Sequence, residues 1–288
     1  MTQTNYTKTY HVSMIETCTY KKVLPESLLG KYVFLETGSA SQIANVVNPE
    51  AFHDIIQILD RFTLTAQLLL TKGGSRGPIP RLIDCAFGSR GWIEARVDLY
   101  KRAYLFPGQN APTVQNDPLG KRANEVLISE TYQQGYSVDN VKDRIALDVE
   151  WNPKDGNLDR DFSAYRAWHQ EGLIDVAVLI TRVQEDTRRL AKTIWNDFIT
   201  RHPEHCRKAQ PVEYGTSTTA NFEKARERVL RGDLGTCPIL VIGIGENTWD
   251  GKPWDGRKAQ YIKSKGFLAL VDSFEDTPLD PTYDIISI

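Results

Sequence analysis

Two acidic residues, Asp148 and Glu150, lie two positions apart in the segment IALDVEWN, residues 145–152. Side chains of a β-strand alternate between its two faces. The apolar residues of this segment therefore share one face, and the two acids share the other, about 7 Å apart along the strand. Like charges held this close repel each other unless a cation or a proton lies between them. The pattern indicates metal binding or acid–base chemistry, and the alternative is an ordinary sheet face turned to solvent.

A third acid, Asp139, precedes Asp148 by nine residues. A turn over residues 141–144 would return Asp139 to the same end of the sheet. Oxygen donors that converge in this way suit a hard cation such as Mg²⁺. Such a cation can activate water and neutralise the charge on a phosphodiester during hydrolysis. The spacing alone is not specific, because many chains contain it by chance.

Strands and helices alternate around these acids. The hydrophobic periodicity predicts strands at residues 31–36, 91–100, 144–151, 175–181, 237–244 and 267–271, helices at 49–62, 159–171, 187–199 and 216–230, and loops at 72–80 and 106–120. We therefore expect an α/β (α+β layered) fold in which helices flank a central mixed β-sheet. No repeat and no clear domain boundary interrupts the 288 residues.

The composition is that of a globular protein, with a net charge of −2. That charge counts mildly against nucleic-acid binding, although residues 182–208 hold seven Lys or Arg against four Asp or Glu. The four cysteines are far apart, so neither a zinc site nor a disulfide framework is indicated. We expect no membrane span, no leader peptide and a cytoplasmic protein. The sequence lacks a Walker-type loop, so no nucleotide cofactor is expected.

Several short motifs surround the acids. The segment VDNVKDRIALDVEWNPKDGNLDRDFSAYR covers residues 138–166 and contains EWNPKD and DRD, and the next apolar strand ends in ITR at residues 180–182. This region resembles the active site of the BglII family of type II restriction endonucleases, within the wider PD-(D/E)XK nucleases. The resemblance covers about half of the chain, most closely residues 138–182.

The resemblance implies roles for individual residues. Asp139, Asp148 and the main-chain carbonyl of Val149 would hold Mg²⁺, with Mn²⁺ able to replace it. Asp139, Asp148 and Glu150 would be the catalytic residues. Glu150 stands where the wider superfamily usually has Lys, and it could orient or deprotonate the attacking water. Asp148 stands where Glu is more usual, and its shorter side chain could move the metal or leave a water molecule between. Because the usual Lys is absent, the identity of the general base stays open.

The resemblance also implies a partner and an architecture. We expect a restriction-endonuclease-like fold, a single endonuclease domain over residues 1–288 with its core at about 85–245, and a homodimer that cuts both strands of double-stranded DNA. The residues expected to contact DNA are Asn152, Lys154, Arg160, Thr216, Ser217 and Thr218. Arg166, on the same element as Arg160, could also reach phosphate, and Arg76 and Arg90 are weaker candidates.

Two other functions remain open at this stage. The chain could be a repair or modification-dependent nuclease of the same fold, or a DNA-binding protein without catalysis. A glycosidase also uses paired carboxylates, but two acids on one strand without an aromatic-rich cleft motif disfavour it.

Overall fold

The computed structural model describes residues 16–73, 77–105, 126–215, 218–262, 267–272 and 285–288. The chain forms two compact units. The main unit comprises Met1–Ala95 and Val138–Ile288, and the hairpin unit comprises Arg96–Ser137.

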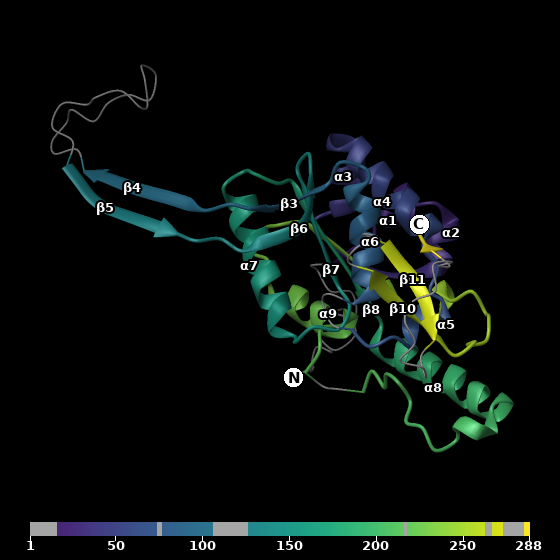
Figure 1. Cartoon of the computed structure of the whole chain (residues 1–288). Helices are drawn as coiled ribbons and strands as arrows, with labels where there is room; N and C mark the ends of the chain where they lie inside the picture. Colours follow the sequence, from purple (N-terminus) through teal and green to yellow (C-terminus); the bar gives the residue numbers. More distant parts are fainter. Residues whose placement is uncertain (1–15, 74–76, 106–125, 216–217, 263–266, 273–284) are drawn as a thin grey trace, which may run out of the picture. The chain divides into compact units, whose positions relative to one another are not determined.

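The centre of the main unit is a seven-stranded sheet in the order β1-β2-β9-β8-β7-β6-β3 (Figure 1). Its strands are β1 (Glu16–Thr17), β2 (Tyr32–Thr37), β3 (Ile93–Arg96), β6 (Ser137–Lys142), β7 (Ile145–Glu150), β8 (Val176–Arg182) and β9 (Ile239–Ile244). The middle strands β7, β8 and β9 are parallel, whereas β6 runs antiparallel to β7, and β2 runs antiparallel to β1 and β9. The prediction of a mixed sheet with flanking helices is confirmed.

Helices cover this sheet. They are α1 (Tyr20–Val23), α2 (Glu26–Lys31), α3 (Ala40–Val47), α4 (Pro49–Arg61), α5 (Ala66–Leu69), α6 (Pro78–Gly88), α7 (Gly156–Gln170), α8 (Gln184–Arg201) and α9 (Phe222–Arg231), with short 3₁₀ turns η3 (Pro203–His205) and η4 (Glu246–Thr248). Helix α4 begins with Pro49, whose fixed φ suits the first helical position. It buries Phe52, Ile55 and Leu59 on one face, as their spacing predicts. Within the described ranges, no helix is both long and apolar enough to cross a membrane.

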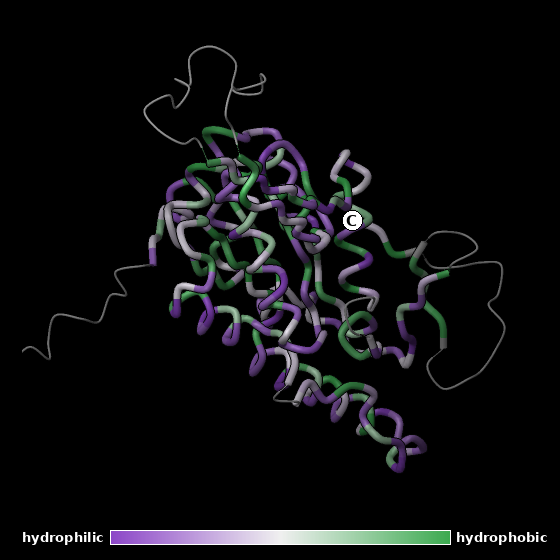
Figure 2. The backbone as a smooth tube through the Cα atoms, turned by 90° about the vertical axis from the view of Figure 1, so that its left-hand side faces the viewer, coloured by the Kyte–Doolittle hydropathy of each residue, from purple (hydrophilic) through white to green (hydrophobic). Residues whose placement is uncertain are grey.

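The two faces of the sheet differ in chemistry. On one face, alternate residues such as Leu147, Val178 and Ile242 join the main hydrophobic core together with α4, α6 and α8. On the other face, α7 packs on β7 and α9 packs on β9. The hydrophobic stretches, green in Figure 2, run through the interior between these layers. Asp148 and Glu150 alternate with core residues, so they lie on the face covered by α7 and α9.

Smaller sheets complete the two units. In the main unit, β10 (Arg257–Ile262), β11 (Phe267–Asp272) and β12 (Ile285–Ile286) form an antiparallel sheet. The hairpin unit consists of β4 (Leu99–Leu105) paired antiparallel with β5 (Val126–Gln133). All eight residues of β5 are exposed.

Three local predictions are wrong. A single half-buried strand over residues 91–100 was expected, but β3 ends at Arg96, β4 begins at Leu99, and Ile93 is 62% exposed. The loop expected at 72–80 gives way to α6 at Pro78, because proline is accepted at a helix start. The helix expected from residue 216 begins at Phe222, and its cap is Asn221, whose side chain accepts from the Lys224 backbone N–H. The loop expected at 106–120 lies outside the described residues.

Candidate active site

Strand β7 carries the two central acids into the interior. Asp148 is 2% exposed and Glu150 is 6% exposed, so the alternative of a solvent-facing sheet surface is wrong. Their neighbours Leu147 and Val149 point to the main core on the opposite face. A charged carboxylate in such surroundings is unfavourable unless it is paired, hydrogen-bonded or protonated.

Strand β6 brings Asp139 to Asp148. The chain reverses at Asp143, which has a φ of 52°, and β6 pairs with β7 from Asn140 to Lys142. One residue further along, the backbone N–H of Asp139 donates to Asp148 Oδ1 at 2.8 Å. The structure therefore brings Asp139 beside Asp148 through the turn that the sequence suggests.

Helix α7 holds the second oxygen of Asp148. The Tyr165 hydroxyl donates to Asp148 Oδ2 at 2.6 Å and also lies 3.3 Å from the Val178 carbonyl. Tyr165 is fully buried, so this hydroxyl fixes the rotamer of Asp148. The sequence reading missed Tyr165, although Asp161 and Tyr165 are four residues apart and therefore share one face of α7.

Glu150 meets another acid of α7. Asp161 is 7% exposed, and its carboxyl lies beside that of Glu150. Burial first, and the nearby Asp148 second, raise the pKa of both carboxyls. Glu150 Oε2 and Asp161 Oδ2 are buried side-chain oxygens without a hydrogen-bond partner in the described part of the protein. Such orphaned acceptors are rare in folded proteins and require an explanation.

A structural buried acid in the same protein looks different. Glu36 on β2 is 0% exposed, but its two oxygens accept from the Thr19 backbone N–H at 2.6 Å, the Thr19 hydroxyl at 2.8 Å and the Ser41 backbone N–H at 2.8 Å. Both oxygens of its carboxylate are hydrogen-bonded to donors of the protein. Glu150 has no comparable set, which separates a group available for chemistry from one that stabilises the fold.

Asp139, Asp148, Glu150 and Asp161, here called the acid cluster, affect one another's pKa values. Burial raises the pKa of Asp148, and the Asp139 charge raises it further. Asp139 is exposed as a residue, but partial desolvation of its carboxyl raises its pKa, with Glu94 adding to the effect. The exposed Arg160 guanidinium opposes these shifts by lowering the pKa of Asp139, Glu150 and Asp161. Of the predicted DNA contacts, Arg160 is therefore the one whose charge acts on these acids.

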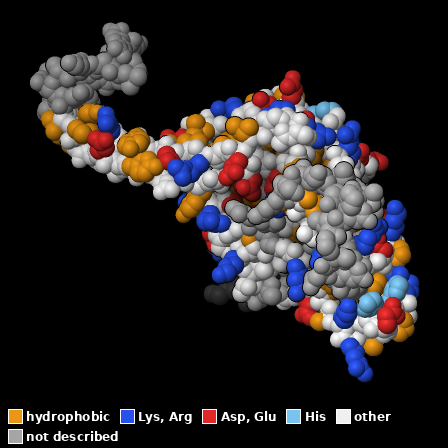
Figure 3. All heavy atoms as spheres, in the orientation of Figure 1, with side chains coloured by type: hydrophobic (Ala, Val, Ile, Leu, Met, Phe, Trp, Pro, Cys, Tyr) orange, Lys and Arg blue, Asp and Glu red, His pale blue; other side chains and the backbone are white. Residues whose placement is uncertain are grey.

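A further acid, Asp84 of α6, reaches this site and was missed from the sequence. Its Oδ1 accepts from the Asn140 side-chain amide at 2.8 Å. Burial raises the pKa of Asp84 to about 7, and Asp139 contributes to the rise. Figure 3 shows acidic side chains on the surface over β3 and β6, which carry the exposed Glu94 and Asp139. Asp84 is 56 residues from Asn140 along the chain, so no local pattern could have paired them.

The predicted metal ligands, which are Asp139, Asp148 and the Val149 carbonyl, are oxygen donors of the kinds that bind a divalent cation. No group of three or more His, Cys, Asp or Glu side chains is arranged to hold a metal ion in the ranges that the structure describes. The expected set contains only two carboxylates, with the Val149 carbonyl as third donor. The Glu150 carbonyl accepts from the Thr181 hydroxyl on the β8 side at 2.6 Å. Since carbonyls alternate along a strand, that of Val149 points toward the β6 side, where the ladder has ended.

Two other predicted DNA contacts, Asn152 and Lys154, interact with neighbouring residues of the protein. Asn152 Oδ1 accepts from the buried Arg182 at 3.2 Å, and Lys154 pairs with Thr219 in an isolated bridge. Lys154 and Thr218 are exposed, whereas Thr216 and Ser217 lie outside the described residues.

The remaining basic candidates are mostly engaged within the protein. Arg90 donates to the Ala86 carbonyl at 2.9 Å and Arg166 to the Asp233 carbonyl at 3.3 Å. Arg76 lies outside the described residues.

Comparison with known proteins identifies the family. The family model described as restriction endonuclease BglII/BglIII matches residues 32–244, which is most of the chain and extends from β2 to the end of β9. No curated protein matches the chain. The match agrees with the mixed sheet, the flanking helices and the buried acids of β7. The chain therefore belongs to the BglII/BglIII family of restriction endonucleases and is a type II site-specific deoxyribonuclease, a hydrolase that binds double-stranded DNA.

Proposed function

We propose that this endonuclease depends on Mg²⁺, which Mn²⁺ can replace, and that Asp139, Asp148 and Glu150 carry its catalysis. Asp139, Asp148 and the Val149 carbonyl hold the cation. When bound, the cation supplies charge neutralisation at the scissile phosphate and acidifies a water molecule. These oxygen donors match the preference of Mg²⁺ for carboxylates, carbonyls and water.

Glu150 is the proton acceptor in this proposal. Burial raises its pKa from the ordinary value, which brings its basicity closer to neutral pH, where a general base is most effective. Its unpartnered Oε2 can accept a hydrogen bond from the attacking water. Asp161 and Tyr165 are positioning residues, because they contact Glu150 and Asp148 and fix how those side chains point.

The observation that carries the proposal is a pair of buried carboxyl oxygens without a hydrogen-bond partner among the described residues, Glu150 Oε2 at the end of β7 and Asp161 Oδ2 on α7. A fold gains nothing in stability from clustering desolvated acids. The cluster is accounted for if a cation and a water molecule complete its contacts during catalysis.

The first prediction concerns cleavage of plasmid DNA of known sequence. Discrete fragments should form with Mg²⁺ or Mn²⁺ and should not form with chelator. Asp139→Ala, Asp148→Ala and Glu150→Ala should each lower the cleavage rate by at least about 10²-fold, the order of magnitude of losing one acid–base or electrostatic contribution. Sequencing the fragment ends gives the recognition site, and a parallel methylated plasmid tests dependence on modification.

The matched control is Asp143→Asn, which changes an exposed acid in the same β6–β7 hairpin. It should cut like the wild-type protein. Full cleavage by the Asp148→Ala or Glu150→Ala protein, or cleavage that survives chelator, would refute the site assignment.

Three expectations accompany this proposal. We infer that Asn152, Lys154, Arg160 and the segment Thr216–Thr218 contact DNA, that the enzyme is a homodimer, and that it acts in the cytoplasm. The electrostatic closeness of Arg160 to Asp139 and Glu150 supports the first expectation for that residue.

A further inference from the structure

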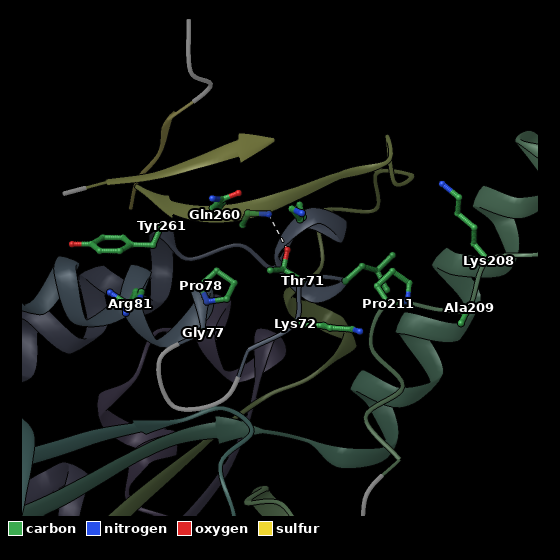
Figure 4. A pocket seen from close by; sticks show the side chains of 13 residues that line it. Thr71, Lys72, Gly77, Pro78, Arg81, Lys208, Ala209, Pro211, Gln260 and Tyr261 are labelled. Atoms are coloured by element: carbon green, nitrogen blue, oxygen red, sulfur yellow. Dashed lines mark hydrogen bonds between the residues drawn. The ribbon is translucent and has the colours of Figure 1, made fainter. Parts of the chain in front are cut away.

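A basic pocket lies outside the acid cluster, at the junction of three segments that are distant in sequence. Its volume is about 640 Å³, and its walls come from the chain before and at the start of α6, from the chain after η3, and from β10. That size falls within the range of about 300–1,000 Å³ that is common for ligand pockets. Figure 4 shows the side chains of Lys72, Arg81 and Lys208 around this hollow.

The charge of the pocket has one sign. Four of its lining residues are basic, namely Lys72, Arg81, Lys208 and Lys258, and none is acidic. The Arg81 guanidinium lies 4.2 Å from the centre of the Tyr261 ring, which fixes its orientation. For a protein of net charge −2, this concentration of cations is a local feature. Concave surfaces lined by one sign of charge focus the field and attract ligands of opposite charge.

The pocket is joined to the acid cluster through α6. Arg81 lies in the pocket and Asp84 lies beside Asn140, three residues and therefore about 4.5 Å further along the helix axis. Arg81 is close enough to lower the pKa of Asp84 against the larger opposing effect of burial. One helical turn thus separates Arg81 of the pocket from Asp84.

A hydrogen-bonded chain makes a second connection. Trp151, which follows Glu150, donates from Nε1 to the Tyr214 hydroxyl at 3.2 Å, and that hydroxyl donates to the Leu69 carbonyl at 2.7 Å. Two residues after Leu69, the Thr71 hydroxyl accepts from the Ala259 backbone N–H at 2.8 Å and closes the wall of the pocket. The pocket is therefore anchored to the strand that carries the acids.

We propose that this pocket binds a backbone phosphate of the DNA duplex that is being cut, at a point away from the scissile phosphate. The inference rests on the proposed function for the location of cleavage, but it assigns a separate site to Lys72, Arg81, Lys208 and Lys258. Ammonium and guanidinium groups recognise phosphate of any source, so the experiment includes free phosphate as a competing ligand.

The experiment measures binding of a fluorescent DNA duplex in chelator at several salt concentrations, where phosphate contacts dominate the affinity. The Lys72→Ala/Lys258→Ala double variant should bind with a salt dependence less steep by about 2, because the two pockets of the homodimer each lose one phosphate contact and each contact contributes about 0.9. Near 0.1 M salt this corresponds to roughly 60-fold weaker binding. The Lys72→Arg/Lys258→Arg variant keeps the charges and should bind within about twofold of the wild type.

The matched control is Lys22→Ala/Lys252→Ala, which removes two exposed lysines that do not line the pocket. It should leave the salt dependence unchanged, and circular dichroism should show all three variants folded. Wild-type affinity and salt dependence in the pocket variant would overturn the inference. A second result would also overturn it. Inorganic phosphate, compared with chloride at equal ionic strength, would raise the melting temperature of the wild type but not of the pocket variant, while both proteins bind DNA equally well. Cleavage at the wild-type rate by a Glu150→Ala protein that binds DNA normally would instead refute the catalytic proposal, and it would leave this inference unaffected.

Discussion

At the scale of single residues, the site depends on carboxyl groups whose burial lowers the stability of the folded protein. Asp148, Glu150 and Asp161 are buried together, and burial raises the pKa of each. Their repulsion is relieved either by protons or by a cation. If the cation binds Asp148 as proposed, protons and the cation compete for its oxygens, and this competition would couple stability, pH and metal binding.

The second prediction concerns pH and stability without metal. Carboxyls with a raised pKa keep protons in the folded protein that the unfolded chain has already lost, so the free energy of unfolding falls as pH rises. The fall begins near the unfolded value of about 4 and continues through the raised folded values, of which that of Asp84 is about 7. Glu150→Gln removes one such group and should flatten the fall, so that this variant is more stable than the wild type at about pH 8.

Urea titrations in chelator at several pH values measure this effect. Asp143→Asn is the control, because Asp143 is an exposed residue of the neighbouring turn and its change should leave the slope as in the wild type. A Glu150→Gln protein that loses stability with pH as steeply as the wild type would show that the Glu150 charge is compensated in the folded state.

At the scale of elements, the face of the sheet opposite the main core leaves little space for its helices. Gly243 of β9 lies under α9, and a Cβ atom added there would be 2.9 Å from Phe222 Cδ2 and 2.9 Å from Val183 Cγ2. Both distances are shorter than side chains tolerate without movement. Glycine at this position therefore allows α9 to approach the sheet beside α7, which supplies Tyr165 and Asp161 to the site.

The third prediction follows from that close approach. Gly243→Ala should lower the free energy of unfolding by about 1–3 kcal/mol, the usual result of overpacking a filled interior. Gly30→Ala is the matched control, since nothing lies within 4 Å of a Cβ at that helical position, and alanine favours a helix over glycine. Chemical denaturation of both variants measures the difference. Equal stability of the Gly243→Ala protein and the wild type would mean that α9 shifts without cost.

At the scale of the whole molecule, one chain carries one acid cluster, whereas a duplex has two strands to cut. The two strands of DNA at a palindromic site are related by a two-fold axis, which a homodimer can match. The basic pocket and the acid cluster would then each occur twice and contact the duplex symmetrically. Two local basic pockets would attract the duplex even though each chain has a net charge of −2.

The fourth prediction concerns this assembly. Sedimentation equilibrium should give twice the 32.6 kDa mass of one chain. Dimers that combine one wild-type chain with one Asp148→Asn chain should nick one strand and accumulate open-circular plasmid, because each chain cuts one strand. A single-chain mass together with direct linearisation of plasmid would contradict the dimer.

The sequence by itself determined the elements with strong periodicity and the family. The alternation of IALDVEWN predicts which residues of β7 face the core and which carry acids, because the side-chain period of a strand is local information. The parallel core strands and the helices α4, α7 and α8 follow from long apolar patterns for the same reason. The prediction of one half-buried strand over residues 91–100 was wrong although the residues alternate correctly. Burial of one face requires another layer to cover it, and Ile93 is exposed.

Only the tertiary structure decided the surroundings of the acids. Tyr165 and Asp161 reach Asp148 and Glu150 because α7 crosses over β7, and Asp84 joins them from α6, far away along the chain. Burial, which sets the direction of every pKa in the cluster, is a property of packed layers and has no local sequence signal. The basic pocket likewise exists only where three distant segments meet.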